Sequence, residues 1–331
     1  MDDVLRVANL NGVPTESAKV GGATYFTRSL EGAWLQNNNN LIFEIESICV
    51  KLHDELANRI FGSLDEYYKQ LPLIPDFIHH AGLNSESMMS RVDFEKQLIK
   101  LSDYEYLNHS LYLYDCRKLV SSIQECSKEV VYLQGEFYRS LNFDELFFPK
   151  IEEPDGVRWI TSPVVTSLHA TLGFIFIRLH SLLDYTAKLV HEVEHLKRDF
   201  STYPRLSSKN ILFSGRKNLS INKEEGTIFE ITDTVREVEI YRNIIIHDGL
   251  MDDMPKVYKV IEKGNTTEKF ILMPDKGKEG RLEAYKNRSL FYSGEDKINI
   301  RLESLVSDFQ NRLLSTLNLT HNILSARSEN S

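Results

Sequence analysis

Residues 161–200 read TSPVVTSLHATLGFIFIRLHSLLDYTAKLVHEVEHLKRDF, and they contain the clearest helical pattern in the chain. Thr161-Ser162-Pro163 predicts a helix start, because a hydroxyl side chain caps the first turn and proline fits the first helical position. Core positions then alternate at spacings of four and three, which predicts a seam of about nine turns against a partner helix. The seam comprises Leu168, Leu172, Ile175, Leu179, Leu182, Thr186, Leu189, Val193, Leu196 and Phe200.

The same kind of spacing predicts further helices on both sides of this stretch. They are expected at 41–71, at 87–141 with a break near Asp103, at 228–247 and at 298–324. Two apolar segments, 257–261 and 269–273, flank Gly264-Asn265 and predict a β-hairpin over about 256–273. The expected fold class is therefore mainly α, a helical bundle with a small β-hairpin insert and an additional N-terminal helical region.

Prolines and glycine concentrate between Asn142 and Pro163, which indicates a boundary between two regions. We therefore expect an N-terminal helical region of unknown role at 1–150 and a helical domain at 160–331. The second region would contain the long seam and the hairpin.

The overall composition is that of an ordinary globular protein. Of 331 residues, 42% are hydrophobic and 26% are charged, which excludes a wholly disordered chain. The three cysteines, Cys49, Cys116 and Cys126, are scattered without a CxxC pair, so a reducing compartment is expected. No uncharged apolar run reaches the ~20 residues of a membrane helix. The sequence predicts a soluble, cytoplasmic protein with no membrane partner and no cofactor.

The charge is distributed unevenly along the chain. The net charge is −9, but residues 1–200 contain 19 Lys and Arg against 29 Asp and Glu, and residues 201–331 contain 20 against 19. Residues 200–223 carry five cations and no acid, which fits either a solvated loop or a path for a phosphate backbone. The cations are Arg205, Lys209, Arg216, Lys217 and Lys223.

A formal zinc-peptidase motif, HExxH, occurs at the end of the long seam. His191 and His195 would hold the metal and Glu192 would activate its water. The seam positions Leu189 and Val193 leave both histidines on the outer face, where a charged helix surface explains them equally well. The zinc hydrolase is therefore a weaker alternative, and the preferred site contains no metal.

A second motif, Arg242-Asn243-Ile244-Ile245-Ile246-His247, lies in the expected helix at 228–247. The apolar stripe Ile231, Val235, Val238 and Ile245 passes through position 242, so Arg242 stands where an apolar residue would be buried. A buried cation needs a partner or a function. The structural alternatives are that Arg242 extends outward or that it pairs with Asp248, Glu237 or Glu239.

Polar residues line a neighbouring face of this helix. Arg236, Glu239, Asn243 and His247 follow one another at spacings of three and four. Histidine can transfer protons near neutral pH, and arginine can bind a phosphate with two donors. These groups suit metal-free RNA cleavage in a cleft between two copies of the helix.

This motif resembles the signature of the HEPN superfamily (higher eukaryotes and prokaryotes nucleotide-binding), R-x4-6-H with Asn, Asp or His often after the Arg. The resemblance covers roughly residues 160–325 and is carried mostly by residues 235–249. It implies an all-helical, homodimeric, metal-independent endoribonuclease of a toxin–antitoxin or phage-defence system. Some members carry a tyrosine two residues after the histidine, where this chain has Gly249.

We therefore expect RNA cleavage that leaves a 2′,3′-cyclic phosphate and a 5′-hydroxyl. Arg242 would neutralise the scissile phosphate, His247 would be the general acid or base, and Asn243 would fix the histidine or contact the ribose. The expected partners are RNA, a second copy of the chain joined through the Arg242 helix, and an antitoxin or regulator protein. Lys209, Arg216, Lys217 and Arg236 would bind the RNA. The alternative is a non-enzymatic helical module that binds a protein, a nucleotide or RNA.

Overall fold

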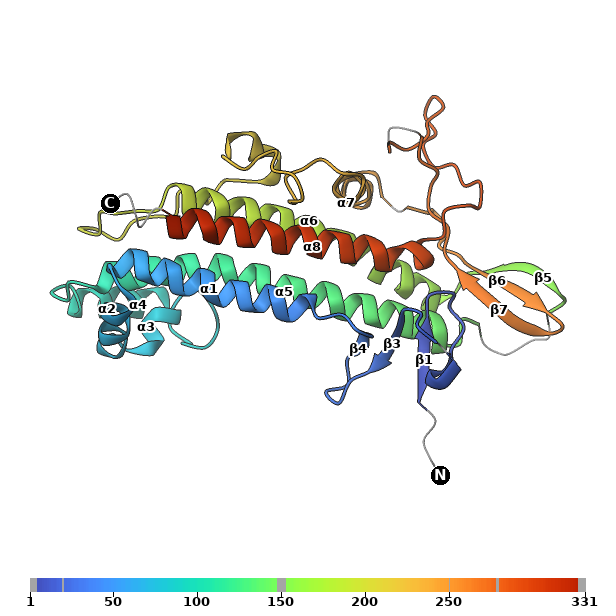
Figure 1. The fold of residues 1–331 in the computed structure, drawn as a ribbon, viewed down its shortest axis with the longest axis horizontal. Coiled ribbons are helices and arrows are strands. Elements are labelled where there is room, and N and C mark those ends of the chain that lie inside the picture. The colour runs from blue at the N-terminus through green and yellow to red at the C-terminus, as the bar shows by residue number, and fades with distance from the viewer. Residues whose placement is uncertain (1–4, 20, 148–152, 250, 278–279, 327–331) are drawn as a thin grey trace. The chain divides into compact units, whose positions relative to one another are not determined.

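The computed structural model describes residues 5–19, 21–147, 153–249, 251–277 and 280–326 (Figure 1). About 54% of the chain is helical, which confirms a mainly α protein. The chain divides into two compact units. Unit 1 comprises Met1–Ile42, Ser127–Ser181 and Ile231–Asn311, and unit 2 comprises Phe43–Cys126, Leu182–Glu230 and Arg312–Ser331.

Long helices supply the framework of both units. They are α1 (Leu41–Phe61), α5 (Leu107–Phe143), α6 (Pro163–Glu194) and α8 (Ile298–Ala326). The predicted helix at 41–71 is interrupted at Gly62, whose φ of 79° is unfavourable for other residues. The predicted break near Asp103 is confirmed by the gap between α4 (Arg91–Lys100) and α5.

Unit 2 also contains three short helices between α1 and α5. They are α2 (Leu64–Gln70), α3 (Asp76–His80) and α4, and a single 3-10 turn (Leu71–Leu73) joins the first two. Ile74 and Ile78 pack with Leu107 and Leu111 of α5 in a buried apolar cluster. This cluster fixes α3 on α5, because an isolated helix of five residues is not stable in water.

The predicted start of α6 is confirmed, but its predicted end is wrong. The Ser162 hydroxyl caps the helix by accepting from the amide of Val165 at 3.3 Å. Seam positions from Leu168 to Val193 are buried as expected. The helix ends at Glu194 rather than at Phe200, because the Lys197 amide donates to the Tyr112 hydroxyl at 3.3 Å instead of continuing the helical ladder.

Among the described residues, α6 is the one helix that by length and composition could cross a membrane. Its apolar residues are those expected of a core helix, since Leu172, Ile175 and Phe176 are fully buried. The helix also carries Arg178, which pairs with Glu129 at 2.7 Å. The apolar character of α6 is therefore only weak evidence for a membrane span.

Unit 1 contains a four-stranded antiparallel sheet that the sequence pattern did not predict. Its order is β2-β1-β3-β4, from β1 (Arg6–Asn9), β2 (Thr15–Glu16), β3 (Tyr25–Arg28) and β4 (Trp34–Gln36). The expected helical character of residues 1–150 therefore begins only at Leu41. Strands of two to four residues are too short for an alternating pattern to be recognised.

The predicted hairpin is confirmed and belongs to a second sheet in unit 1. β6 (Val257–Glu262) and β7 (Asn265–Phe270) are antiparallel, and Lys263 and Gly264 form the turn with φ values of 51° and 72°. Two successive positive φ values are typical of the tight hairpin turn. The third strand, β5 (Gly156–Ile160), pairs with β6 and comes from the segment expected to be a linker.

Asn299, at the start of α8, connects both sheets of unit 1. Its side-chain amide donates to the carbonyl of Leu10 at 2.6 Å, and its oxygen accepts from the amide of Ile271 at 3.1 Å. Its own carbonyl accepts from the Tyr138 hydroxyl of α5 at 2.6 Å. Asn299 is fully buried, so these bonds satisfy polar groups that water does not reach.

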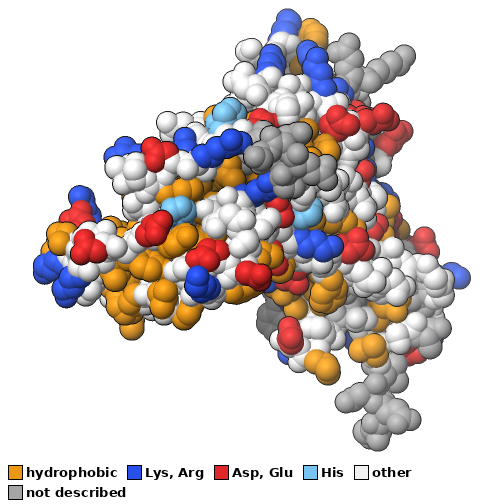
Figure 2. Space-filling model, turned by 60° about the vertical axis from the view of Figure 1, so that its left-hand side comes forward, with side chains coloured by type: hydrophobic (Ala, Val, Ile, Leu, Met, Phe, Trp, Pro, Cys, Tyr) orange, Lys and Arg blue, Asp and Glu red, His pale blue; other side chains and the backbone are white. Residues whose placement is uncertain are grey.

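The surface carries charges of both signs. On the face shown in Figure 2, Lys and Arg side chains are interspersed with Asp and Glu side chains, and hydrophobic side chains also reach the surface. The net charge of −9 is therefore not spread as a uniform negative surface. The division at 1–150 and 160–331 stays a prediction, and each compact unit draws on both of these segments.

Gly135 of α5 provides a test of the packing in unit 1. A Cβ atom at this position would lie 1.7 Å from the carbonyl oxygen of Trp34 in β4, so the strand would have to move. Gly135→Ala should lower the free energy of unfolding by more than about 2 kcal/mol, although alanine normally favours a helix interior by about 1 kcal/mol. Urea denaturation measures this change.

Gly215→Ala is the matched control, because a Cβ atom there meets no other atom within 4 Å. The close approach of α5 and β4 would be contradicted if Gly135→Ala left the free energy of unfolding unchanged. It would also be contradicted if both variants lowered this free energy equally.

Candidate functional site

The Arg242 motif lies where an α-helix changes into a π-helix. The α-helix α7 (Asp233–Asn243) is followed directly by a π-helical turn (Ile244–Asp248), which ends at Gly249 with a φ of 104°. The helix begins at Asp233 rather than at residue 228, because the Thr232 hydroxyl accepts from the amide of Val235 at 3.4 Å and caps it. π-helical turns are rare and occur often at functional sites.

Two contacts hold this region on α6. The ring of Tyr241 packs on Phe176 with centroids 4.9 Å apart. The side chain of Ile245 lies against Gly173, where an added Cβ would be 3.6 Å from Ile245 Cδ1. Side chains of α7 and of the π turn are therefore both in contact with α6.

The π turn brings the three predicted catalytic residues together. Arg242 Nη1 donates to Asn243 Oδ1 at 3.0 Å and lies 3.3 Å from His247 Nε2. On a regular α-helix, residues five apart would be separated by about 140° around the axis. The wider π turn instead places residue 247 back beside residue 242. Asn243 contacts the arginine, and its expected role of fixing the histidine or contacting the ribose stays a prediction.

The expected burial of Arg242 is wrong. The buried face of this helix is formed by Val235, Val238, Tyr241 and Ile244, whereas Ile231 is 43% exposed. Arg242 lies at the edge of that face and is half-buried, and His247 is exposed. The predicted stripe fails because Tyr241 and Ile244 occupy the positions toward the core. The cation is therefore accessible from solvent.

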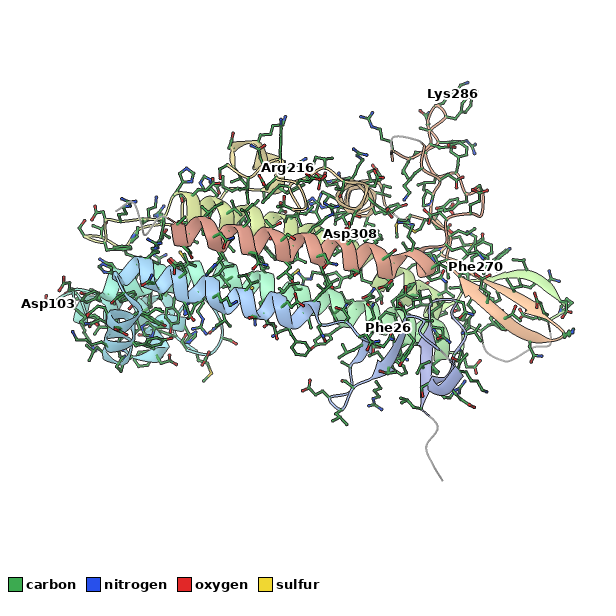
Figure 3. The ribbon with its side chains drawn as sticks, in the orientation of Figure 1. Phe26, Asp103, Arg216, Phe270, Lys286 and Asp308 are labelled. Carbon is green, nitrogen blue, oxygen red and sulfur yellow. The ribbon has the colours of Figure 1, made fainter. Side chains whose placement is uncertain are left out.

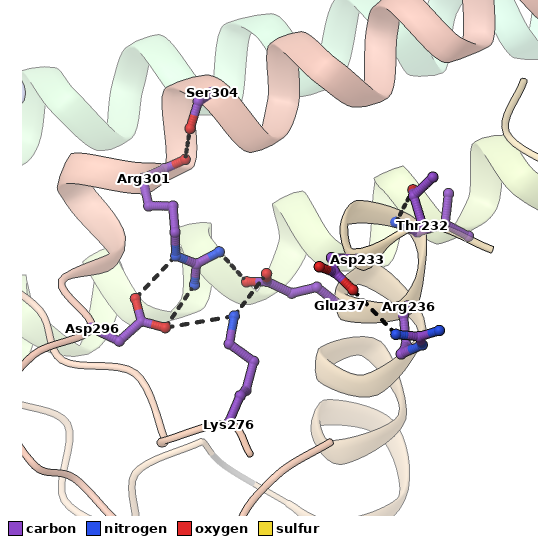
Figure 4. Close-up of polar contacts among 9 residues, drawn as sticks. Thr232, Asp233, Arg236, Glu237, Lys276, Asp296, Arg301 and Ser304 are labelled. Carbon is purple, nitrogen blue, oxygen red and sulfur yellow. Dashed lines mark hydrogen bonds and ion pairs between the residues drawn. The ribbon is translucent and has the colours of Figure 1, made fainter. Parts of the chain in front are cut away.

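Glu237 is a buried carboxylate on α7. Its partners, Arg301 and Lys276, lie in the same segment of unit 1, Ile231–Asn311. It accepts from Arg301 Nη1 at 2.5 Å and from Lys276 Nζ at 2.9 Å, and Asp296 completes the group by binding Arg301 (Figure 4). Burial opposes the charge on Arg301, but Glu237 and Asp296 together raise its pKa. Because Glu237 is occupied in this way, it is not the partner that the sequence offered for Arg242.

A largely apolar pocket of about 560 Å³ lies beside the π turn. Ile245 forms part of its wall, with residues of α6 and of the segment after the π turn. Its lining includes Ala170, Gly173, Phe174, Met251 and Pro255. Arg236, predicted to bind RNA, lies on α7 in the same unit and pairs with the exposed Asp233 at 3.1 Å.

The other predicted RNA-binding residues belong to unit 2. Lys209 and Lys217 are exposed, and Arg216 is half-buried. The Arg216 guanidinium lies 4.1 Å from the ring centroid of Phe213 (Figure 3), and the Phe213 amide donates to Asp184 of α6 at 2.8 Å. The basic segment is therefore anchored on a helix through Phe213, and its lysines extend into solvent.

The zinc-peptidase interpretation does not fit the side chains of the HExxH motif. His191 and His195 stack with ring centroids 4.2 Å apart. Glu192 is only 1% exposed, and its oxygens accept from the Tyr112 hydroxyl at 2.5 Å and the Ser208 amide at 2.8 Å. A peptidase glutamate must face the metal-bound water. Here Glu192 is a buried acceptor that holds residues 207–208 against α5 and α6.

No protein-family model, no curated protein and no solved structure matches this chain. The chemistry of Arg242, Asn243 and His247 is therefore argued from their geometry. The sequence pattern identified these three residues, but it did not reveal the π turn that joins them. A run of three isoleucines after Asn243 gives no local signal for the change in helical pitch.

The buried charge group predicts a large effect of Glu237 on stability. Glu237→Gln removes the negative charge that faces Arg301 and Lys276, and should lower the free energy of unfolding by about 2–4 kcal/mol. Guanidinium chloride denaturation, followed by circular dichroism, measures the loss.

The control is Asp233→Asn, which breaks the exposed pair with Arg236 on the same helix. This variant should change stability far less, because water and salt screen an exposed pair. Equal effects of the two substitutions would show that Glu237 does not anchor α7.

Proposed function

We propose that this protein is a metal-independent endoribonuclease of the HEPN type, which acts as a cytoplasmic homodimer. The observation that carries the proposal is the contact of Arg242 Nη1 with Asn243 Oδ1 and His247 Nε2 on one accessible turn. A permanent cation and a titratable imidazole at this distance are suited to a phosphodiester. A role as a toxin or phage-defence effector is part of the same proposal.

The Arg242–His247 contact directs a donor of Arg242 toward His247 Nε2. A guanidinium only donates, so His247 Nε2 must accept and must carry a lone pair. A nitrogen with a lone pair is what a general base requires. When an RNA phosphate takes the donors of Arg242, Nε2 becomes available to a ribose hydroxyl. Asn243 keeps the guanidinium in place through its side-chain oxygen.

The reaction needs one proton acceptor and one proton donor. His247 removes the proton from the ribose 2′-hydroxyl, and the 2′ oxygen forms a bond with phosphorus. The bond from phosphorus to the 5′ oxygen breaks, and that oxygen takes a proton from an imidazolium. Arg242 offsets the additional charge on the phosphate oxygens. The products are a 2′,3′-cyclic phosphate and a 5′-hydroxyl.

A second copy of the chain would supply the second imidazole. One His247 cannot act as base and as acid in the same concerted step, whereas two helices related by a two-fold axis present two imidazoles. Exposed apolar side chains near the motif support such a pairing, with Ile246 49% exposed and Phe174 39% exposed. An antitoxin or regulator that covered this surface would inhibit the enzyme.

The decisive experiment is RNA cleavage in excess EDTA. The unmodified protein should cut total RNA and leave cyclic phosphate ends. Arg242→Ala and His247→Ala should each reduce the rate by about 10²–10⁴, the usual contribution of general acid–base catalysis. Size-exclusion chromatography should show that both variants keep the dimer.

His195→Ala is the matched control, because His195 is also exposed but lies in the HExxH motif, outside the Arg242 motif. Its cleavage rate should be unchanged. An Arg242→Ala protein that unfolds or becomes monomeric would make the residue structural. Absence of cleavage by the unmodified protein would favour the non-enzymatic interaction module.

The basic segment predicts a salt effect. If Lys209 and Lys217 bind phosphates, the double Lys→Ala variant should reduce the slope of log affinity against log salt by about 1.4, or ~0.7 per contact with a single strand. Fluorescence anisotropy with labelled single-stranded RNA measures the slope. Replacing the exposed Lys51 and Lys100 instead should leave it unchanged, and a similar loss in both double variants would exclude a specific path.

A further inference from the structure

Histidine and carboxylate side chains gather on α3 and on the loop that follows it in unit 2. Asp76, His79 and His80 share one face of the helix, because residues three and four apart are neighbours on a helix. Glu86 lies in the loop. Among the described residues, Asp76, His80 and Glu86 are the one group of this kind whose ligand atoms all lie within 4.8 Å of one another.

The distances within this cluster are longer than hydrogen bonds. Asp76 Oδ1 lies 3.7 Å from His80 Nε2 and 4.0 Å from His79 Nδ1. His80 Nδ1 lies 3.8 Å from Glu86 Oε2. Hydrogen bonds of this type measure about 2.7–3.2 Å. A single ion binds one nitrogen of His80, and one ligand atom from each of Asp76, His80 and Glu86 lies within 4.8 Å of the others. Ligands bonded to zinc at 2.0–2.1 Å are about 3.3 Å apart around a tetrahedron, so side-chain movements of about 1–2 Å would bring these groups to a shared ion.

His79 provides an independent indication of a ligand. Its side chain is 1% exposed, and neither ring nitrogen has a hydrogen-bond partner among the described residues. Buried polar atoms rarely lack a partner. The ring stacks on Tyr114 with centroids 4.5 Å apart, so its orientation is fixed with Nδ1 toward Asp76.

The surrounding structure keeps the loop close to α3. The Asn84 side chain lies 3.1 Å from His80 Nδ1 and accepts from the Glu86 amide at 3.0 Å. The Lys118 ammonium donates to the carbonyl of Leu83, which fastens the loop to α5. On the other side of α3, the cluster of Ile74 and Ile78 with α5 fixes the helix. Both halves of the cluster are therefore positioned before any ion binds.

We propose that Asp76, His79, His80 and Glu86 form a binding site for a divalent transition-metal ion, with Zn²⁺ the best match. Imidazole nitrogens with carboxylate oxygens suit zinc, and the two carboxylates match its charge. The ion would join the loop to α3 and stabilise this part of unit 2. The site is separate from the residues of the ribonuclease proposal and does not depend on it.

Titration calorimetry of the full chain with Zn²⁺ alone tests the site. The unmodified protein should bind one ion per chain. His80→Ala and Glu86→Gln should each weaken binding at least tenfold. Glu86 is exposed, so Glu86→Gln should keep the fold, and circular dichroism checks this. The control is the double variant His191→Ala/His195→Ala, which should bind zinc with unchanged affinity.

Thermal unfolding gives a second readout. Zn²⁺ should raise the melting temperature of the unmodified protein and of the His191/His195 variant, and should raise that of Glu86→Gln by less at the same Zn²⁺ concentration. Absence of stoichiometric binding by the unmodified protein would overturn the proposal. Full affinity in both His80→Ala and Glu86→Gln would also overturn it, as would loss of binding in the His191/His195 control.

Discussion

The position of the Arg242 motif depends on the buried charge group around Glu237. α7 contains eleven residues, and a helix of this length has little stability of its own in water. Glu237 anchors it through Arg301 of α8 and Lys276, and Asp296 holds both of these cations. Because one partner alone would leave a buried charge uncompensated, the four residues act as a set. The set fixes α7, and Tyr241 then rests on Phe176.

Long periodic segments were predictable from the sequence, and short or irregular ones were not. The Ser162 cap and the apolar seam identify α6, because each depends on residues close together in the chain. The end of α6 depends on Tyr112, which is 85 residues away from the amide that it binds. The strands of the first sheet have two to four residues each and were missed for lack of length. The predicted apolar stripe through position 242 was wrong for a related reason, because it treated residues 228–247 as one regular α-helix and the helix changes to a π-helix at Ile244.

The two histidine motifs show that a sequence motif does not by itself determine the contacts of its side chains. From the residue composition, HExxH is expected by chance less often than R-x4-H. Its glutamate nevertheless accepts hydrogen bonds from Tyr112 and Ser208. R-x4-H is expected by chance more often, but the π turn places its arginine and its histidine in contact. In each case the direction of the side chain decides the chemistry, and that direction depends on tertiary contacts. The cluster at Asp76 passed unnoticed because Glu86 comes from a loop whose path the sequence does not give.

The environment of each imidazole limits what it can do. His169 is half-buried and its Nε2 lies 3.1 Å from the carbonyl of Lys256, so this nitrogen must carry the hydrogen and the ring has a structural partner. His79 is buried, and neither of its ring nitrogens has a hydrogen-bond partner among the described residues, so these nitrogens are available to a metal. His247 is exposed and faces a guanidinium, so it can exchange protons with solvent and with a substrate. The proton transfer that we propose is therefore assigned to His247 rather than to His79 or His169, because a catalytic imidazole must reach both its substrate and a source of protons.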